Sequence, residues 1–300
     1  MSIRTIEEPV LAGNAEPVAL TQWQLFRRRF FKHKVAVVSV VLLILFTIAC
    51  FAASLIAPFS NTAQDLHLGA VSPNGTHWFG TDLLGRDQLT RLLYAGQISL
   101  KIGFAVALIA TVFGTAVGAI AGYFGSSVDQ ALMRFTDLFL VVPALAILAI
   151  ALRHFGHTDT VVILVLAALF WMYVARVVRG QVLSLKEKEF IEAARASGAS
   201  KTRIIVRHVV PNIIGPIMVN ATLAVAAAIV TESTLSFLGL GIQPPNTSWG
   251  NMLSDAEGFT GTAQAYLIYA PGLAILFTVL CVNFIGDGFR DAFDPQSEKH

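Results

Sequence analysis

Long apolar stretches constrain this chain more than any other feature of its sequence. A helix that crosses a bilayer needs about 20 predominantly apolar residues, and six stretches approach or exceed that length. Only 13% of the residues are charged, whereas soluble domains carry about 25%. We therefore predict an all-α integral membrane protein with six transmembrane helices. The predicted spans are Val35–Ala57, Ile98–Phe124, Ala131–Leu152, Thr160–Val178, Ile213–Leu240 and Ala265–Ile285.

The distribution of positive charge predicts the orientation of these spans. Lys and Arg residues concentrate in the cytoplasmic loops of membrane proteins. With the N-terminus inside, 17 of the 21 Lys and Arg residues fall in inner segments, and the other four are Arg86, Arg91, Lys101 and Arg153. Both termini are therefore expected in the cytoplasm. Lys101 lies near the end of the second span, where its long side chain is expected to snorkel to the interface.

The predicted spans divide the chain into five parts. These are a cytoplasmic tail over 1–34, a first transmembrane helix over 35–57, an extracytoplasmic loop over 58–97, a five-helix core over 98–288 that includes a cytoplasmic loop over 179–212, and a cytoplasmic tail over 289–300. The net charge of +2 gives no electrostatic support for a nucleic-acid partner. Both cysteines lie in apolar stretches and are expected to be free thiols.

Two of the spans contain residues that bear on helix packing. Ala110, Gly114, Gly118 and Gly122 recur every four residues and so share one helical face. Small residues let helices approach closely in lipid. We expect this face to pack within the chain, and contact with a second membrane subunit is the alternative. Pro143 lies inside the third span and predicts a kink there.

The inner loop before the fifth span is predicted to form a helical elbow. Lys186–Ala196 contains strong helix formers and no helix breaker. Gly198 permits a sharp turn that a residue with a Cβ resists. A second helix is predicted over Ser200–Val210 with Ser200 as its N-cap, and Pro211 suits the first turn of the helix that follows.

This elbow resembles the EAA loop of ABC importer permeases. The resemblance is carried by Glu192-Ala193-Ala194, Gly198 and Pro211-Asn212. A solvated cationic loop that only fixes topology would explain the charges of the segment, but not this spacing. In that family the loop docks on a cytoplasmic ATPase and transmits its closure to the membrane spans. The resemblance thus implies an ATPase-coupling role for Glu192, Ala193, Ala194, Ser197, Gly198, Arg203 and Pro211.

Three further stretches resemble the C-type subunit of the dipeptide, oligopeptide and nickel permease group. They are HWFGTDLLGRDQLTRLLYAGQISL (77–100), LSFLGLGIQPPNTSWGNML (235–253) and NFIGDGFRDAFDP (283–295). The resemblance implies the type I ABC importer permease fold and a place in the bacterial inner membrane. It also implies a second, B-type permease, two cytoplasmic ATPase subunits and an extracytoplasmic substrate-binding protein that delivers a di- or oligopeptide.

Charged residues in the outer loop and the fifth span allow two interpretations each. Thr81-Asp82 is a capping-type pair that predicts the start of an amphipathic helix. Asp82, Arg86 and Asp87 favour a capped, salt-bridged helix start, and the alternative is a surface that faces the substrate-binding protein. Glu232 either belongs to the translocation path or gate, or is a buried carboxylate hydrogen-bonded to its neighbours.

We find no motif for covalent chemistry in the sequence. A G-x-x-x-x-G-K-[ST] phosphate loop is missing, so ATP and Mg are expected on partner ATPases, and no cofactor, metal or catalytic site is expected in this chain. An ion-coupled secondary transporter is disfavoured because Glu232 is the only clear charged candidate in the membrane core. A membrane enzyme is disfavoured because no convergent polar site is visible. Nickel chelates, glutathione or haem are the alternative cargoes.

Overall fold

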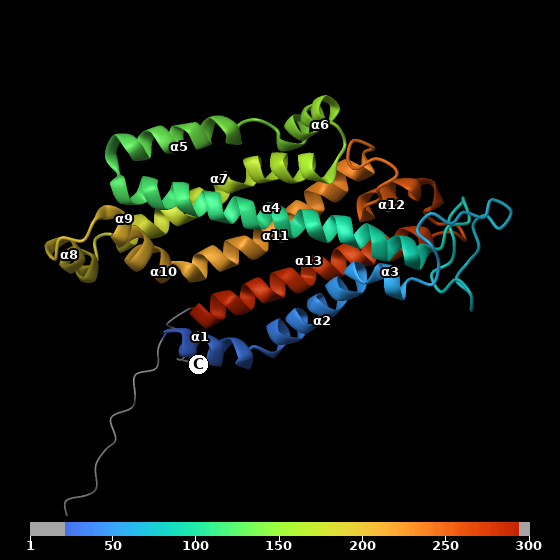
Figure 1. Cartoon of the computed structure of the whole chain (residues 1–300), viewed down its shortest axis with the longest axis horizontal. Helices are drawn as coiled ribbons and strands as arrows, with labels where there is room; N and C mark the ends of the chain where they lie inside the picture. Colours follow the sequence, from blue (N-terminus) through green and yellow to red (C-terminus); the bar gives the residue numbers. More distant parts are fainter. Residues whose placement is uncertain (1–21, 294–300) are drawn as a thin grey trace, which may run out of the picture.

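The structure is a computed structural model that describes residues 22–293. Within this range the chain is a bundle of long helices, most of which run along the long axis of the molecule (Figure 1). The residues described form no extended sheet, and a single isolated β-bridge pairs Thr81 with Asp87. The predicted all-α fold class is therefore confirmed.

Five helices in the described range are long and apolar enough to cross a membrane. They are α2 (Lys34–Phe51), α4 (Gln88–Phe124), α7 (Asp159–Leu185), α11 (Ile214–Phe237) and α13 (Tyr266–Phe293). Each corresponds to one predicted span. Within α4 the helix starts at Gln88 rather than Ile98 and continues for 37 residues, so the outer loop is shorter than its predicted range of 58–97.

The third predicted span is broken rather than kinked. It consists of α5 (Ser126–Leu140) and α6 (Ala144–Phe155), whose axes are bent by 79°. Pro143 lies at the break with extended backbone angles and precedes the first residue of α6. Proline has no N–H to donate to the preceding turn and clashes with it, so the helix ends and restarts. If the bent pair counts as one span, the described residues contain six.

The shorter helices lie at the two ends of the bundle. Near the N-terminus are α1 (Gln22–Lys32) and, after α2, α3 (Ala53–Ile56). The remaining ones are α8 (Glu189–Ala196), α9 (Lys201–Ile204), the π-helical turn η1 (Ile205–Val209), α10 (Val210–Asn212), α12 (Trp249–Asp255) and the 3-10 turn η2 (Glu257–Phe259).

Helices α4 and α7 pack most closely, and the glycines of α4 explain why. A Cβ added at Gly114 would lie 2.5 Å from the Trp171 carbonyl oxygen, and one at Gly122 would lie 2.8 Å from Val182 Cβ. Gly118 packs directly against the backbone of Ala175. The prediction that this small-residue face packs within the chain is confirmed. The alternative, that the face contacts a second membrane subunit, is wrong because α7 covers it.

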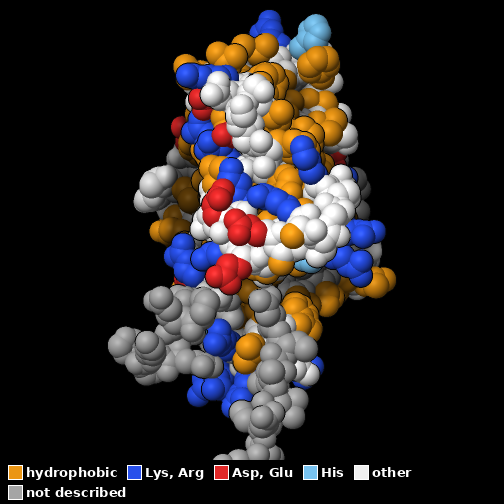
Figure 2. Space-filling view, turned by 90° about the vertical axis from the view of Figure 1, so that its left-hand side faces the viewer, with side chains coloured by type: hydrophobic (Ala, Val, Ile, Leu, Met, Phe, Trp, Pro, Cys, Tyr) orange, Lys and Arg blue, Asp and Glu red, His pale blue; other side chains and the backbone are white. Residues whose placement is uncertain are grey.

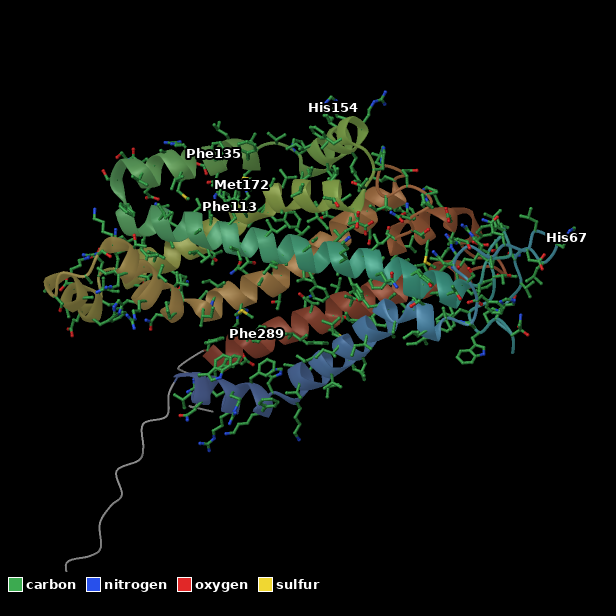
Figure 3. All side chains as sticks on the ribbon, viewed as in Figure 1. His67, Phe113, Phe135, His154, Met172 and Phe289 are labelled. Atoms are coloured by element: carbon green, nitrogen blue, oxygen red, sulfur yellow. The ribbon has the colours of Figure 1, made fainter. Side chains whose placement is uncertain are left out.

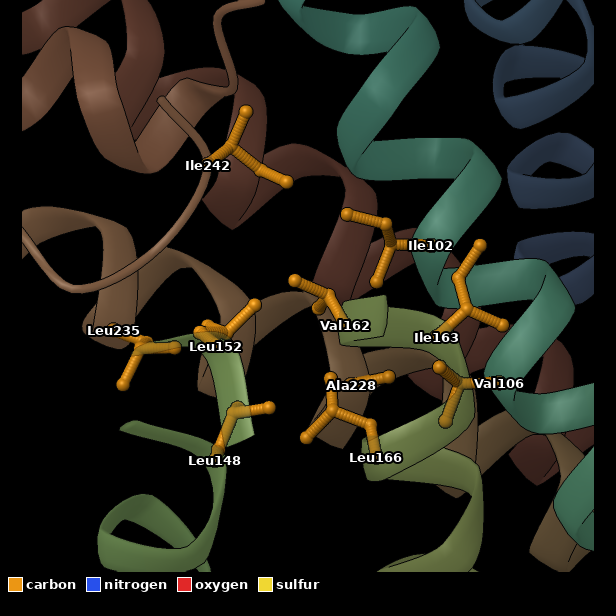
Figure 4. Close-up of a cluster of buried hydrophobic side chains, with 10 residues drawn as sticks. All are labelled: Ile102, Val106, Leu148, Leu152, Val162, Ile163, Leu166, Ala228, Leu235 and Ile242. Atoms are coloured by element: carbon orange, nitrogen blue, oxygen red, sulfur yellow. The ribbon is translucent and has the colours of Figure 1, made fainter. Parts of the chain in front are cut away.

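Apolar clusters and ion pairs attach the broken span to this pair. Leu148 and Leu152 of α6 are buried against Ile102, Leu166 and Leu235 from α4, α7 and α11 (Figure 4).

On α5, Asp129 and Asp137 pair with Arg179 and Arg176 of α7. In Figure 3, Phe135 lies on the side of α5 that faces α4 and α7, which carry Phe113 and Met172. Each half of the broken span is therefore attached to the bundle by contacts of its own.

Lys101 has a carboxylate partner that the sequence did not identify. Its Nζ forms an ion pair with Asp159 Oδ2 at 2.6 Å, and Asp159 is the first residue of α7. Because α4 begins at Gln88, Lys101 lies inside this helix and not at its end. Its partner Asp159 lies on the neighbouring helix α7.

Candidate functional site

The elbow between α7 and α11 lies at one end of the bundle (Figure 1). In α8, Ile191 is fully buried and packs in a cluster with Val182 and Ile204. Glu192 and Ala193 on the other side of the helix are exposed. The helix is therefore held on its inner side by Ile191, with Ala194 packed against the same cluster, and it exposes Glu192 and Ala193.

The predicted turn at Gly198 is confirmed. Gly198 has a φ of +77°, a conformation that residues with a Cβ rarely adopt. The Ser197 hydroxyl donates to the Ala193 carbonyl oxygen at 2.8 Å and so satisfies one of the last carbonyl groups of α8. The Ser200 hydroxyl accepts a bond from Arg203 N at 3.4 Å, as expected of an N-cap.

The second helix of the elbow is less regular than predicted. Instead of one helix over Ser200–Val210, the chain forms α9, the π-helical turn η1 and α10 in succession. Pro211 lies in α10 and cannot donate to the turn before it, and an interrupted hydrogen-bond ladder favours such a π-helical insertion. The Asn212 side-chain amide donates instead to the His208 carbonyl oxygen at 2.6 Å.

Two aromatic residues that the sequence analysis missed attach the elbow to α4. The Arg195 guanidinium lies 5.4 Å from the centre of the Tyr123 ring, and Lys201 Nζ lies 5.0 Å from that of Phe124. Both distances are within the range of cation–π attraction. These contacts connect each half of the elbow to the same end of the longest helix. Figure 2 looks onto this end, where Lys and Arg side chains outnumber acidic ones.

An ion-pair cluster at the opposite end contains two of the predicted outer residues. Asp82 Oδ2 accepts from Arg86 Nε at 2.6 Å and from Arg91 Nη1 at 2.7 Å. Arg91 Nη2 also donates to Asp255 Oδ2 at 2.8 Å. Asp82 and Arg91 are buried, whereas the Asp255 side chain is 53% exposed. The salt-bridged interpretation is confirmed, and Arg91 and Asp255 are the partners that the analysis missed.

Asp87, not Thr81-Asp82, caps the helix that follows. Its Oδ2 accepts from Thr90 N at 2.8 Å, and its Oδ1 lies 2.9 Å from His77 Nδ1. The amphipathic helix expected to begin at Thr81 is therefore wrong: Thr81 and Asp87 close a tight turn. The expected apolar side is found in the first turns of α4, where Leu92 and Leu93 are buried.

A polar cleft of about 420 Å³ adjoins this cluster. Arg86 and Asp255 are among its lining residues, together with the side-chain amides of Gln243, in the loop between α11 and α12, and of Asn251 in α12. Arg86 is thus placed where it can meet another molecule, whereas Asp82 and Asp87 point inward to hold the loop.

Glu232 lies in the interior of the bundle. Its side chain is 1% exposed, and Oε1 accepts from the Ser236 hydroxyl at 2.7 Å. The other oxygen, Oε2, has no hydrogen-bond partner among the described residues. This placement favours the buried-carboxylate interpretation over an open path. The partner is Ser236 and not Thr231 or Thr234.

An apolar groove of about 720 Å³ runs along α4 beside the elbow and α11. Thr111, Thr115, Ile205 and Ile217 are among its lining residues. Apart from Thr111, Thr115 and Thr202 its lining is apolar.

Comparison with known families assigns this architecture. Residues 114–299 match the family described as binding-protein-dependent transport system inner membrane component. Residues 21–70 match the N-terminal TM domain of oligopeptide transport permease C. The chain belongs to this permease family. The description of the family as an inner membrane component agrees with a multi-pass membrane protein and with the helix bundle described above.

Individual relatives resemble this permease over almost its whole length. The oligopeptide transport system permease protein OppC of Haemophilus influenzae is 41% identical over 97% of this chain and 92% of its own. OppC of Escherichia coli is 41% identical over 91% of each chain. The dipeptide transport system permease protein DppC of Alkalihalophilus pseudofirmus is 37% identical over 93% of this chain and 91% of its own.

A solved structure shares the fold. An inward-facing form of the MetNI methionine ABC transporter aligns with a TM-score of 0.57 at 17% identity, covering 68% of this chain and 96% of the other. At that identity the likeness shows the fold alone. It confirms the predicted fold of a type I ABC importer permease.

Proposed function

We propose that this chain is the C-type permease subunit of an ATP-driven importer of di- or oligopeptides. The observation that carries the proposal is the exposed α8 elbow at one end of a bundle that belongs to the permease family. The relatives are named as oligopeptide and dipeptide transport permeases, which supports a peptide cargo. They do not favour nickel chelates, glutathione or haem.

The elbow docks on a cytoplasmic ATPase subunit in this proposal. Ala193 and Ala194 allow a close approach, Glu192 offers an exposed carboxylate, and Gly198 sets the angle between the two halves of the elbow. Ser197, Arg203 and Pro211 hold the backbone in this shape. The ATPase binds ATP and Mg, and this chain contributes no catalytic residue. Movement of the elbow reaches α4 through the contacts of Arg195 and Lys201 with its aromatic end.

The remaining surfaces are assigned to the other components. A second, B-type permease covers the groove between α4 and α11, and the two permeases form the path between them. A substrate-binding protein meets the outer end near Arg86, with Asp82 and Asp87 shaping that surface from beneath. The elbow and both termini lie on the cytoplasmic side of the bacterial inner membrane. Glu232 supports the outer end of α11 from inside and lies outside the path.

A charge reversal at Glu192 tests the coupling role. In the reconstituted complex, Glu192→Lys is expected to lower peptide uptake and peptide-stimulated ATP hydrolysis at least tenfold, because it places a cation on the docking surface. Gly198→Pro should act similarly by changing the elbow angle. Glu187→Lys, an equally exposed reversal just before α8, is the matched control and should leave both activities nearly unchanged. Unaltered uptake in Glu192→Lys and Gly198→Pro would contradict the assignment.

A further inference from the structure

Helix α1 is amphipathic, and its inner face is fixed by aromatic stacking. The Phe26 ring stacks on Phe293 of α13 with centroids 4.5 Å apart, and Phe30 stacks on Phe289 at 5.3 Å. Phe289 marks this end of α13 in Figure 3. Stacked aromatic pairs stabilise a contact by more than the burial of their surface area alone would provide. Helix α1 is therefore a built part of the bundle with a defined outer face.

That outer face combines cations with large aromatic side chains. Trp23, Arg27 and Phe31 follow one another at four-residue spacing and so lie on one side of the helix. Trp23 is 69% exposed and Phe31 is 66% exposed. Arg28 and Lys32 form the adjacent row and are also exposed.

Positive charge is concentrated in this part of the chain. The segment 22–34 contains five Lys and Arg residues and no Asp or Glu. Within the part of the chain that the structure describes, none of Arg27, Arg28 and Lys32 takes part in an ion pair. A shallow hollow of about 510 Å³ is lined by Gln24, Arg27, Arg28 and Phe31. It offers two guanidinium groups beside one aromatic ring.

The position of α1 determines what this face meets. Only His33 separates α1 from the apolar span α2, and the chain changes direction there (Figure 1). His33 Nδ1 accepts from Ala36 N at 3.1 Å, and Nε2 lies 3.3 Å from Asp291 Oδ2 of α13. The junction is thus held from both sides. A helix fixed directly at the end of a membrane span lies at the level of the lipid headgroups.

We propose that the outer face of α1 binds anionic phospholipid headgroups at the membrane surface on the elbow side. Arg27 and Arg28 contact headgroup phosphates through charge-assisted hydrogen bonds. Trp23 and Phe31 lie between the headgroups and the first part of the acyl chains, where amphipathic and aromatic side chains are favoured. An acidic protein surface would also pair with the arginines, but the connection of α1 to the apolar span α2 through His33 alone favours the membrane surface as the partner.

Photo-crosslinking in the assembled transporter tests this inference locally. The complex is reconstituted in vesicles of equal parts phosphatidylcholine and phosphatidylglycerol that contain a trace of photoreactive phosphatidylglycerol, or of photoreactive phosphatidylcholine in parallel. Crosslinked peptides of this chain are mapped by mass spectrometry. We expect phosphatidylglycerol, and not phosphatidylcholine, to label the segment 22–34 preferentially.

Variants then separate charge recognition from simple proximity. Arg27→Gln and Arg28→Gln should each lower this labelling about fivefold, the change expected for one cation near an anionic surface. The double Arg27→Lys, Arg28→Lys variant should keep most of it, which also shows that the helix still folds. Arg134→Gln, an exposed arginine on α5, is the matched control and should have no effect on the segment.

Two results would overturn the inference. One is equal labelling of segment 22–34 by both lipids, unaffected by the Arg27 and Arg28 variants. The other is no labelling of this segment together with loss of the co-purifying ATPase in those variants, which would assign the face to a protein partner. Neither result depends on the peptide cargo or on the role of Glu192, so failure here is distinguishable from failure of the proposed function.

Discussion

The two ends of this permease are stabilised in opposite ways. The elbow formed by α8, α9, η1 and α10 owes its shape to residues close together in sequence, such as Gly198 and Ser200, and exposes most of its surface. The outer ion-pair cluster joins Asp82 and Arg91 to Asp255, which lies 164 residues beyond Arg91. The elbow, which we propose contacts a partner, is shaped by local contacts and exposed, whereas the outer cluster is held by contacts between distant residues.

The difference predicts where substitutions damage the whole molecule and where they act locally. The elbow is attached to the bundle by Ile191, Ile204 and two cation–π contacts, so it can change shape without unfolding the spans. The outer cluster connects the loop before α4 and α4 itself to Asp255, the last residue of α12, so its loss affects several elements together. Three substitutions, ordered by expected effect, test this contrast.

The largest effect is expected for Arg91→Met at the outer end. Removing one partner of a buried ion pair costs about 3–5 kcal/mol, and the lower end applies because Arg86 still bonds Asp82. The thermal melting midpoint of the purified complex should fall strongly. Lys101→Met is the control, since it breaks a pair whose lysine is 53% exposed and should cost at most about 1 kcal/mol. Equal losses in the two variants would contradict a special role for the cluster.

A smaller global effect is expected for Gly118→Ala, in the contact between α4 and α7. The added methyl group meets the backbone of Ala175, and overpacking of this kind costs about 1–3 kcal/mol. Gly180→Ala offers a matched comparison, because a Cβ there meets nothing within 4 Å. Replacing a helical glycine at an open position is expected to stabilise slightly. Melting midpoints that shift in the same direction would show that close packing of α4 on α7 is unimportant.

The smallest effect is expected for Ser200→Ala in the elbow. Loss of an N-cap costs about 0.5–2 kcal/mol, and the exposed, long bond to Arg203 places this residue at the low end. The melting midpoint of the complex should not change measurably. Hydrogen exchange should nevertheless become faster in α9 and remain unchanged in α4. Destabilisation of the whole bundle by this variant would show that the elbow is part of the framework.

The sequence predicted features whose cause is local. The six apolar stretches, the turn at Gly198, the cap at Ser200 and the small-residue face of α4 all follow from composition or spacing within a few residues. The start of α4 was misplaced because its first turns carry polar residues such as Gln88, whose burial depends on packing against other segments. Hydropathy alone cannot show that a polar turn is covered.

Features that depend on distant partners were missed for the same reason. Nothing near Arg91 in the sequence identifies Asp255 as its partner, and nothing near Arg195 identifies Tyr123. Glu232 allowed two interpretations because its polar neighbour Ser236 lies one helical turn away, while its burial is set by other helices. Pro143 predicted a disturbed helix at the right place, but one residue does not determine the size of the bend, which is 79°.

Thiol labelling at Ala193 tests the central claim, that α8 is the surface on which the ATPase docks. The native cysteines Cys50 and Cys281 are buried, so Ala193→Cys introduces an exposed thiol that a maleimide can report. In membranes containing the permeases alone, the introduced thiol should react rapidly, and adding the ATPase subunits should protect it. Thr76→Cys, at the opposite end, should react at the same rate with and without ATPase. Undiminished labelling at Ala193→Cys in the fully assembled, transport-active complex would contradict the account.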